Sequence, residues 1–380
     1  MEPNMLGAYG PWAASLVPDG PARLSFRDEA FRDLDAWRRE ARAGLLSRLM
    51  RPPTGGTPRS DVQNRFQHDG VTIEHLSWQL PYGPPTEAYL LKPAKAEGRL
   101  PAVLALHDHG GNKYFGTRKI VRLCDEPHTL MKEHQTRYYG GVGWANELAK
   151  RGYAVLVHDA FLFGSRRVRV GDLPDVLRKG LNEVAPESEA EIKGYNEFAS
   201  GHESTVAKSL FCAGTTWPGV TTAEDQRALD YLCSRPDVDA DRVGCAGLSG
   251  GGLRTVFLAG VDDRITCACC VGMMTTWKDY LLRKSHTHTW MVYVPGLPGD
   301  LDYPEILGLR APKPTLVLND SGDQLFSADA MHEADAILAG VYTKAGAADR
   351  YRCTFYPGPH KFDRPMQAEA FDWFDRWLKA

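Results

Sequence analysis

The sequence lacks the features that would direct it to a membrane or to nucleic acid. No uninterrupted apolar run approaches the ~20 residues of a membrane-spanning helix, and no basic segment followed by a long apolar stretch opens the chain. Its 45 Lys and Arg residues are balanced by 48 Asp and Glu residues, and a formal net charge of -3 leaves no basic stripe for a phosphate backbone. We therefore expect a cytoplasmic protein that binds neither a membrane nor nucleic acid.

The eight cysteines are too scattered to indicate a disulfide framework. Cys267, Cys269 and Cys270 alternate along an apolar run, which would distribute them over both faces of a strand. Zinc sites instead use C-x-x-C pairs carried on loops. We interpret the cysteines as reduced thiols that act as small core residues.

Short apolar runs recur through most of the chain. They lie at 102–106, 154–157, 242–246, 265–271, 315–318 and 352–355. Amphipathic helical patterns separate them, most clearly at 222–234 and 367–378. Continuous apolar strands alternating with helices are typical of an α/β fold, a mostly parallel sheet covered by helices on both faces. Upstream, the extended segments 71–80 and 87–91 flank a Pro- and Gly-rich turn and predict a hairpin.

We predict two domains, an N-terminal helical extension at 1–60 and a catalytic domain at 61–380. Apolar residues recur at helical spacing between 26 and 50, before two prolines end the helix. This helix can pack on the main domain or on a second subunit, so a homo-oligomer is compatible with the sequence. The stretches at about 112–142 and 161–219 are too long for plain connections, and we expect them to form cap insertions over the active site.

The strongest functional pattern is Gly247-Leu248-Ser249-Gly250-Gly251, a G-x-S-x-G motif directly after an apolar run. Such a motif forms a sharp strand-to-helix turn that exposes the serine, and glycines permit the close backbone approach. In a chain with 37 glycines the motif alone could arise by chance. The residues that follow the motif decide whether it is a chance match or the turn that carries a nucleophile.

A serine nucleophile needs a histidine to accept its proton and a carboxylate to orient the imidazole. The run 315–318 leads into a polar turn that holds Asp320 and Asp323, and the run 352–355 leads into a Pro- and Gly-rich loop that holds His360. We assign Asp323 as the acid and His360 as the base, and interpret Asp320 as a turn-capping residue. With Ser249, they occur in the order serine, acid, histidine, each after a predicted strand.

The tetrahedral intermediate also needs backbone N–H donors aimed at its oxyanion. We expect one from Gly250 and the second from the turn after 102–106, where either His109 or Gly111 could supply it. Which of the two donates depends on the register of the turn, and His109 is favoured.

Histidines also allow a metal interpretation. His107, Asp108 and His109 could bind a metal together with His286 and His288, but no helical H-E-x-x-H pattern accompanies them. We therefore expect no metal and no other cofactor.

Together with the motif around Ser249, several segments resemble the acetyl-xylan-esterase-like branch of the α/β-hydrolases, which is akin to dienelactone-hydrolase-like proteins. They are Leu229-Asp230-Tyr231-Leu232, Arg235-Pro236-Asp237-Val238-Asp239, Asp241-Arg242-Val243-Gly244 and Asp262-Asp263-Arg264-Ile265. The resemblance covers about residue 86 to the C-terminus. Dienelactone hydrolases use a cysteine nucleophile, whereas this chain has Ser249. The family often has His-Gly where this chain has His107-Asp108, which leaves the shape of the oxyanion turn open.

The resemblance implies an α/β-hydrolase fold and a triad of Ser249, Asp323 and His360. It also implies hydrolysis of a small-molecule ester, an acetyl or other short acyl ester of a small or sugar-like alcohol. A peptidase or a carbon–carbon bond hydrolase could use the same triad, and a non-catalytic binding protein could share the fold. The chain has no propeller-sized N-terminal domain of the prolyl-oligopeptidase kind, which disfavours the peptidase alternative.

Overall fold

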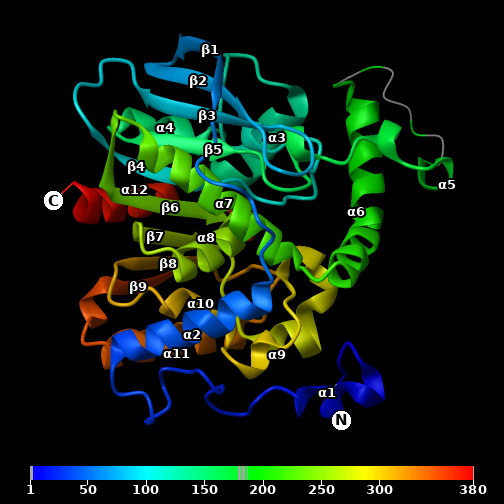
Figure 1. The fold of residues 1–380 in the computed structure, drawn as a ribbon, viewed down its shortest axis with the longest axis vertical. Helices are drawn as coiled ribbons and strands as arrows, with labels where there is room; N and C mark the ends of the chain where they lie inside the picture. The colour runs from blue at the N-terminus through cyan, green and yellow to red at the C-terminus, as the bar shows by residue number, and fades with distance from the viewer. Residues whose placement is uncertain (1–2, 179–180, 182–184, 186, 380) are drawn as a thin grey trace.

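The computed structural model describes residues 3–178, 181, 185 and 187–379, and their strands form a nine-stranded sheet (Figure 1). The strand order is β1-β2-β3-β5-β4-β6-β7-β8-β9. The strands are β1 Asp61–His68, β2 Val71–Trp78, β3 Thr86–Pro93, β4 Leu100–Leu106, β5 Ala154–His158, β6 Val238–Leu248, β7 Ile265–Val271, β8 Thr315–Asp320 and β9 Tyr351–Tyr356. From β5 to β9 neighbouring strands run parallel, while β1, β2 and β3 pair antiparallel and β3 pairs antiparallel with β5.

Helices cover both faces of this sheet. The α-helices of the described residues are α1 Gly10–Ala14, α2 Leu34–Leu49, α3 Thr129–Tyr139, α4 Trp144–Lys150, α5 Asp175–Arg178, α6 Glu189–Cys212, α7 Trp217–Ser234, α8 Gly250–Val261, α9 Trp277–Asp279, α10 Tyr303–Gly308, α11 Ala328–Lys344 and α12 Arg364–Leu378. The neighbouring residues Val103 and Leu104 of β4 point to opposite faces and belong to separate buried clusters. Helices α2, α7, α8, α10 and α11 contribute to the cluster of Leu104, and α4 and α12 to that of Val103. None of the described helices is long and apolar enough to cross a membrane.

The predicted mostly parallel sheet is confirmed, and so is the hairpin, formed by β2 and β3. The apolar runs 102–106 and 242–246 belong to β4 and β6, which extend beyond them at one or both ends. The edge strand β1 was not expected, because its side chains are mostly exposed and polar and so carry no apolar signal. Helix α7 begins at Trp217 rather than 222, since the Thr216 side chain caps it by accepting the N–H of Gly219.

The N-terminal segment packs against the main domain through α2 (Figure 1). The helix predicted between 26 and 50 spans Leu34–Leu49. Trp37 is fully buried, its ring stacks on Phe26 with centroids 4.6 Å apart, and its Nε1–H donates to the carbonyl of Leu24 at 2.7 Å. The buried residues of α2 lie in the same apolar cluster as those of α8 and α10. Buried residues between 24 and 49 thus belong to the core of the sheet.

The two long stretches contain structure of their own. Residues 112–142 hold a short 3-10 helix, η2 Thr117–Lys119, and α3. Residues 161–219 hold α5, α6 and the first turn of α7, and α6 stands beside the sheet in Figure 1. Residues 179–180, 182–184 and 186 of this second stretch lie outside the described residues, as do residues 1–2 and 380 of the two predicted domains.

Candidate active site

Ser249 lies on a sharp turn between β6 and α8. Its φ of 57° and ψ of -117° are a strained conformation for a residue with a side chain. A Cβ on Gly247 would lie 2.4 Å from the carbonyl oxygen of Leu106, and one on Gly251 would lie 2.0 Å from the same oxygen. Only glycine fits at these two positions, so the glycines of the motif are required by the packing of the turn against β4. The motif therefore forms the strand-to-helix turn that its sequence predicts.

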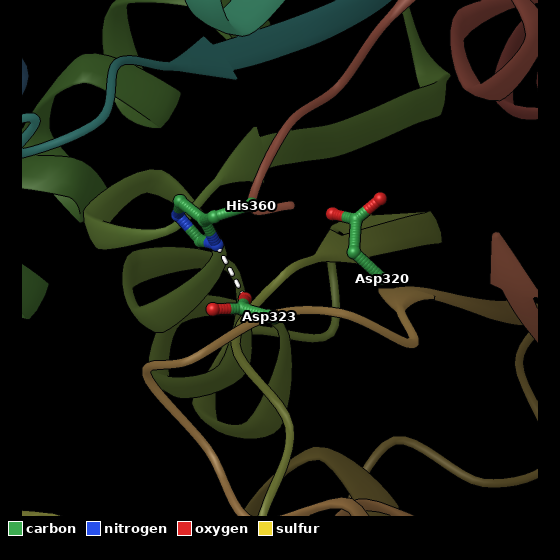
Figure 2. A group of neighbouring side chains, drawn as sticks. All are labelled: Asp320, Asp323 and His360. Carbon is green, nitrogen blue, oxygen red and sulfur yellow. Dashed lines mark hydrogen bonds and ion pairs between the residues drawn. The ribbon is translucent and has the colours of Figure 1, made fainter. Parts of the chain in front are cut away.

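Asp323 and His360 are brought together from separate loops (Figure 2). Asp323 lies in the turn after β8, and His360 lies in the loop between β9 and α12. His360 Nδ1 donates to Asp323 Oδ2 at 2.6 Å, and the backbone N–H of Leu325 donates to Asp323 Oδ1 at 2.9 Å. This arrangement puts the imidazole proton on Nδ1 and leaves Nε2 able to accept one.

Ser249 and His360 line one cavity of about 190 Å³. Its lining residues are Asp108, His109, Gly110, Gly111, Tyr138, Leu248, Ser249, Thr287, His288, Thr289, Leu325 and His360. Among the described residues, buried His360 Nε2 has no hydrogen-bond partner, so it does not bond to the Ser249 hydroxyl. Catalytic hydrogen bonds are often long before substrate binds and tighten in the complex.

Asp320 lies beside this pair but has a different bonding partner (Figure 2). It ends β8, and its Oδ2 accepts the backbone N–H of Lys361 at 2.9 Å. Its carbonyl accepts the N–H of Asp323 at 3.1 Å. Burial raises the pKa of the Asp320 carboxyl to about 7. Asp320 thus connects its own turn to the loop that carries His360, and its contacts go beyond the local turn cap expected from the sequence.

The turn after β4 meets the start of α8. A Cβ on Gly250 would lie 2.8 Å from the backbone nitrogen of His109, so this nitrogen lies next to Gly250. Gly250 opens α8, where the first N–H groups have no acceptor within the helix. The N–H of Gly111 is already engaged, because it donates to His109 Nδ1 at 3.1 Å. Of the two residues considered for this turn, only His109 has its backbone nitrogen among the three atoms nearest to that Cβ position.

The histidines considered as metal ligands are not gathered into one site. Ala160 donates its N–H to His107 Nε2 at 3.2 Å, and His107 Nδ1 bonds to the carbonyl of Asp108 at 3.0 Å. His288 Nε2 bonds to the carbonyl of Leu325 at 3.0 Å. Within the described part of the chain, the one group with clustered ligand atoms is Asp320, Asp323 and His360. In that group the Asp323–His360 hydrogen bond already joins two members.

Sequence reasoning missed several residues that shape the site. Gly272 follows β7 with a φ of +55°, and a Cβ there would lie 2.9 Å from His360 Cε1. Tyr138 of α3 lines the cavity, with its ring edge-on to His360 at 6.4 Å between centroids. The segment of Thr287 to Thr289 closes another side. Only Gly272 had a sequence signal, a glycine at the carboxyl end of an apolar run.

Comparisons with known proteins also indicate a hydrolase. No family model matches the chain. The chain is 30% identical over 294 residues, which are 77% of this chain and 83% of its relative, to a Bacillus subtilis (strain 168) protein named "Putative hydrolase YtaP".

Solved structures resemble the fold at lower identity. A "putative acetyl xylan esterase" from Bacteroides fragilis NCTC 9343 matches with a TM-score of 0.65 and 18% identity, over 93% of this chain and 83% of that one. A glucuronoyl esterase from Solibacter usitatus matches with a TM-score of 0.61 and 17% identity, over 95% and 99%. With the mostly parallel sheet and the turn at Ser249, these matches show that the chain belongs to the α/β-hydrolase superfamily, in the same family as YtaP.

Proposed function

We propose that the protein is a serine hydrolase of carboxylic esters, acting on acetyl or other short acyl esters of small or sugar-like alcohols. Ser249 Oγ attacks the ester carbonyl while His360 Nε2 accepts its proton, and Asp323 orients the imidazole. The N–H groups of Gly250 and His109 stabilise the oxyanion. His360 returns the proton to the departing alcohol, and water then hydrolyses the acyl-enzyme through the same residues.

One observation carries this proposal: a single cavity is lined by the strained Ser249, by His360 and by the turn of His109, while Asp323 holds His360 from behind. A nucleophile, a base with a free Nε2 and two adjacent N–H donors are the groups that acyl transfer needs. The names of the structural relatives, which are esterases, support an ester as the bond cleaved.

The lining of the cavity supports a small uncharged substrate. Among the described residues that line it, none is Lys or Arg, so no cation faces a carboxylate or phosphate group. Burial lowers the pKa of His288 to about 4, so this imidazole is neutral at pH 7. Thr287, Thr289 and Tyr138 offer hydroxyl groups to a polar alcohol. A cavity of about 190 Å³ has room for a short acyl group.

The first experiment compares Ser249→Ala with Ser327→Ala, a serine that caps α11 without a side-chain hydrogen bond. Ser249→Ala should abolish the hydrolysis of aryl acetates, and Ser327→Ala should keep it. An organophosphate should label Ser249 in the wild-type protein, as identified by peptide mass spectrometry. Full activity in Ser249→Ala would overturn the proposal.

The second experiment defines the substrate with a panel of acetyl, butyryl and octanoyl esters of aryl and sugar alcohols. We expect kcat/KM to fall as the acyl chain lengthens and to fall again when the alcohol carries a negative charge. Peptide amides and carbon–carbon substrates complete the panel. Cleavage of one of these, with no ester hydrolysed, would assign the triad to a different reaction.

A further inference from the structure

Lys119 buries its ammonium group directly behind the oxyanion turn. Its side chain has no exposed surface, and Nζ donates to the carbonyls of Asp108 at 2.8 Å and His109 at 2.9 Å. The Oδ2 atom of Asp108 lies at 4.0 Å, beyond hydrogen-bond distance. A buried ammonium is costly unless its N–H groups are bonded. Here the two shortest contacts are backbone carbonyls of the turn that carries the His109 N–H.

The geometry of the peptide group connects this contact to the cavity. The carbonyl of Asp108 and the N–H of His109 belong to one peptide bond, which is not among the cis bonds of the described residues. In a planar trans peptide these two groups point in opposite directions. A donor that fixes the carbonyl therefore also fixes the direction of the N–H, which lies beside Gly250.

A second donor reaches the same carbonyl. Because Ala160 donates its N–H to His107 Nε2, the His107 proton lies on Nδ1, which donates to the Asp108 carbonyl at 3.0 Å. Donors on a carbonyl polarise the whole peptide group and strengthen its N–H as a donor. A cationic donor does this more strongly than a neutral one. The charge of Lys119 thus acts through one peptide bond on the position where an oxyanion would form.

We propose that Lys119 is a positioning residue for ester hydrolysis, which orients and polarises the Asp108–His109 peptide so that the His109 N–H stabilises the oxyanion. This inference rests on the proposed function, because it takes that N–H as one of the two oxyanion donors. A purely structural lysine would instead contribute to stability with no selective effect on the transition state.

Burial makes the protonation of Lys119 sensitive to alkaline pH. Asp108 and Asp159 favour the ammonium form, whereas Lys113 and Arg254 disfavour it. Burial outweighs the two carboxylates and lowers the pKa of Lys119 to about 8. The ammonium is therefore present at neutral pH and lost as the pH rises above about 8. If it supports the oxyanion donor, kcat/KM should fall over the same range.

The experiment measures steady-state hydrolysis of an aryl acetate by Lys119→Met and Lys119→Gln. Loss of one oxyanion donor costs on the order of 10²–10³ in rate, so we expect kcat to fall by about 10²-fold in Lys119→Met. KM should change little, because the donor acts mainly on the transition state. The alkaline decline of the wild type should be absent from both variants.

Lys344→Met is the matched control. Lys344 Nζ also donates to two backbone carbonyls, those of Phe26 at 2.6 Å and Asp28 at 2.7 Å, and none of these three residues lines the cavity. The Lys344→Met variant should melt at a lower temperature than the wild type, with no change in kcat. Lys119→Gln, which keeps a hydrogen-bond donor, serves as the test variant if Lys119→Met does not fold.

A folded Lys119 variant with wild-type kcat and a wild-type pH profile would overturn the proposal. If Ser249→Ala is inactive in the same assay, the proposed hydrolase function still stands. If the wild type hydrolyses no ester and no organophosphate labels Ser249, the proposed function fails, and the role of Lys119 fails with it. The two failures are therefore distinguishable.

Discussion

Replacing Gly272 with alanine should displace His360 while leaving the fold intact. A Cβ at Gly272 would lie 2.9 Å from His360 Cε1 and 3.0 Å from Leu248 Cδ1. The backbone at Gly272 is held in place, because the Gly272 N–H donates to the carbonyl of Leu318 at 2.8 Å. Carbon atoms in contact lie about 3.5–4.0 Å apart, so the imidazole must move by roughly 0.6–1 Å. That shift changes both its bond to Asp323 and its approach to the serine hydroxyl.

The expected loss in kcat/KM for an aryl acetate is about 10–10²-fold, since a misplacement of about 1 Å can cost on the order of 10² in rate. Alanine at a φ of +55° also costs about 1–2 kcal/mol of stability. Gly346→Ala is the control, because Gly346 has a φ of +67° and a Cβ there would meet no atom within 4 Å. Both variants should melt at similarly lowered temperatures. Equal activity of Gly272→Ala and Gly346→Ala would refute the displacement of His360 by a Cβ at Gly272.

Four further outcomes are expected. Asp323→Asn should lower kcat by about 10⁴-fold in the ester assay, because it favours the wrong tautomer of the base, whereas Asp320→Asn should keep most activity. Burial raises the pKa of Asp320 to about 7, so the native state holds this proton more tightly than the unfolded chain. Its contribution to the free energy of unfolding therefore falls as the pH rises from about 4 to 7. Between pH 5 and pH 8, urea melts should show a smaller fall in the free energy of unfolding for Asp320→Asn than for the wild type. Trp37→Ala should destabilise the protein by about 3–5 kcal/mol in urea melts; a loss below 1 kcal/mol would contradict the packing of α2. A chelator should leave ester hydrolysis unchanged, and a loss restored by added metal would favour the histidine-ligand interpretation.

Residues with local signals were predictable from the sequence, and residues that act through distant contacts were not. The strand before Ser249 and the turn after it are encoded by an apolar run followed by glycines, so the motif and the structure agree. The bond between Asp323 and His360 followed from their places after two parallel strands, whose carboxyl ends meet at one edge of the sheet. Glu203 bonds to His109 Nε2 at 2.8 Å although the two residues are 94 positions apart. No pattern within α6 marks Glu203 as a partner of that turn.

Both long stretches contact the turn that follows β4. The Asp108 carboxylate accepts from Tyr139 Oη at 2.5 Å and faces His134, both on α3. Burial alone would raise the pKa of Asp108, but His134 and Lys119 hold it well below its usual range, so the carboxylate stays charged. Glu203 binds His109 from α6.

Three elements of these stretches, η2, α3 and α6, thus contact the turn of Asp108 and His109. The backbone nitrogen of His109 lies next to Gly250. In the described residues, the stretch at 161–219 contributes no side chain to the cavity lining. Its α6 reaches residues at the cavity through Glu203, which bonds to His109 Nε2 at 2.8 Å and accepts the N–H of Trp290, next to Thr289, at 3.4 Å. Changes in α6 should therefore alter kcat through the position of the turn before they alter which ester fits. If the His109 N–H donates to the oxyanion as proposed, both long stretches act on the transition state through the turn of Asp108 and His109.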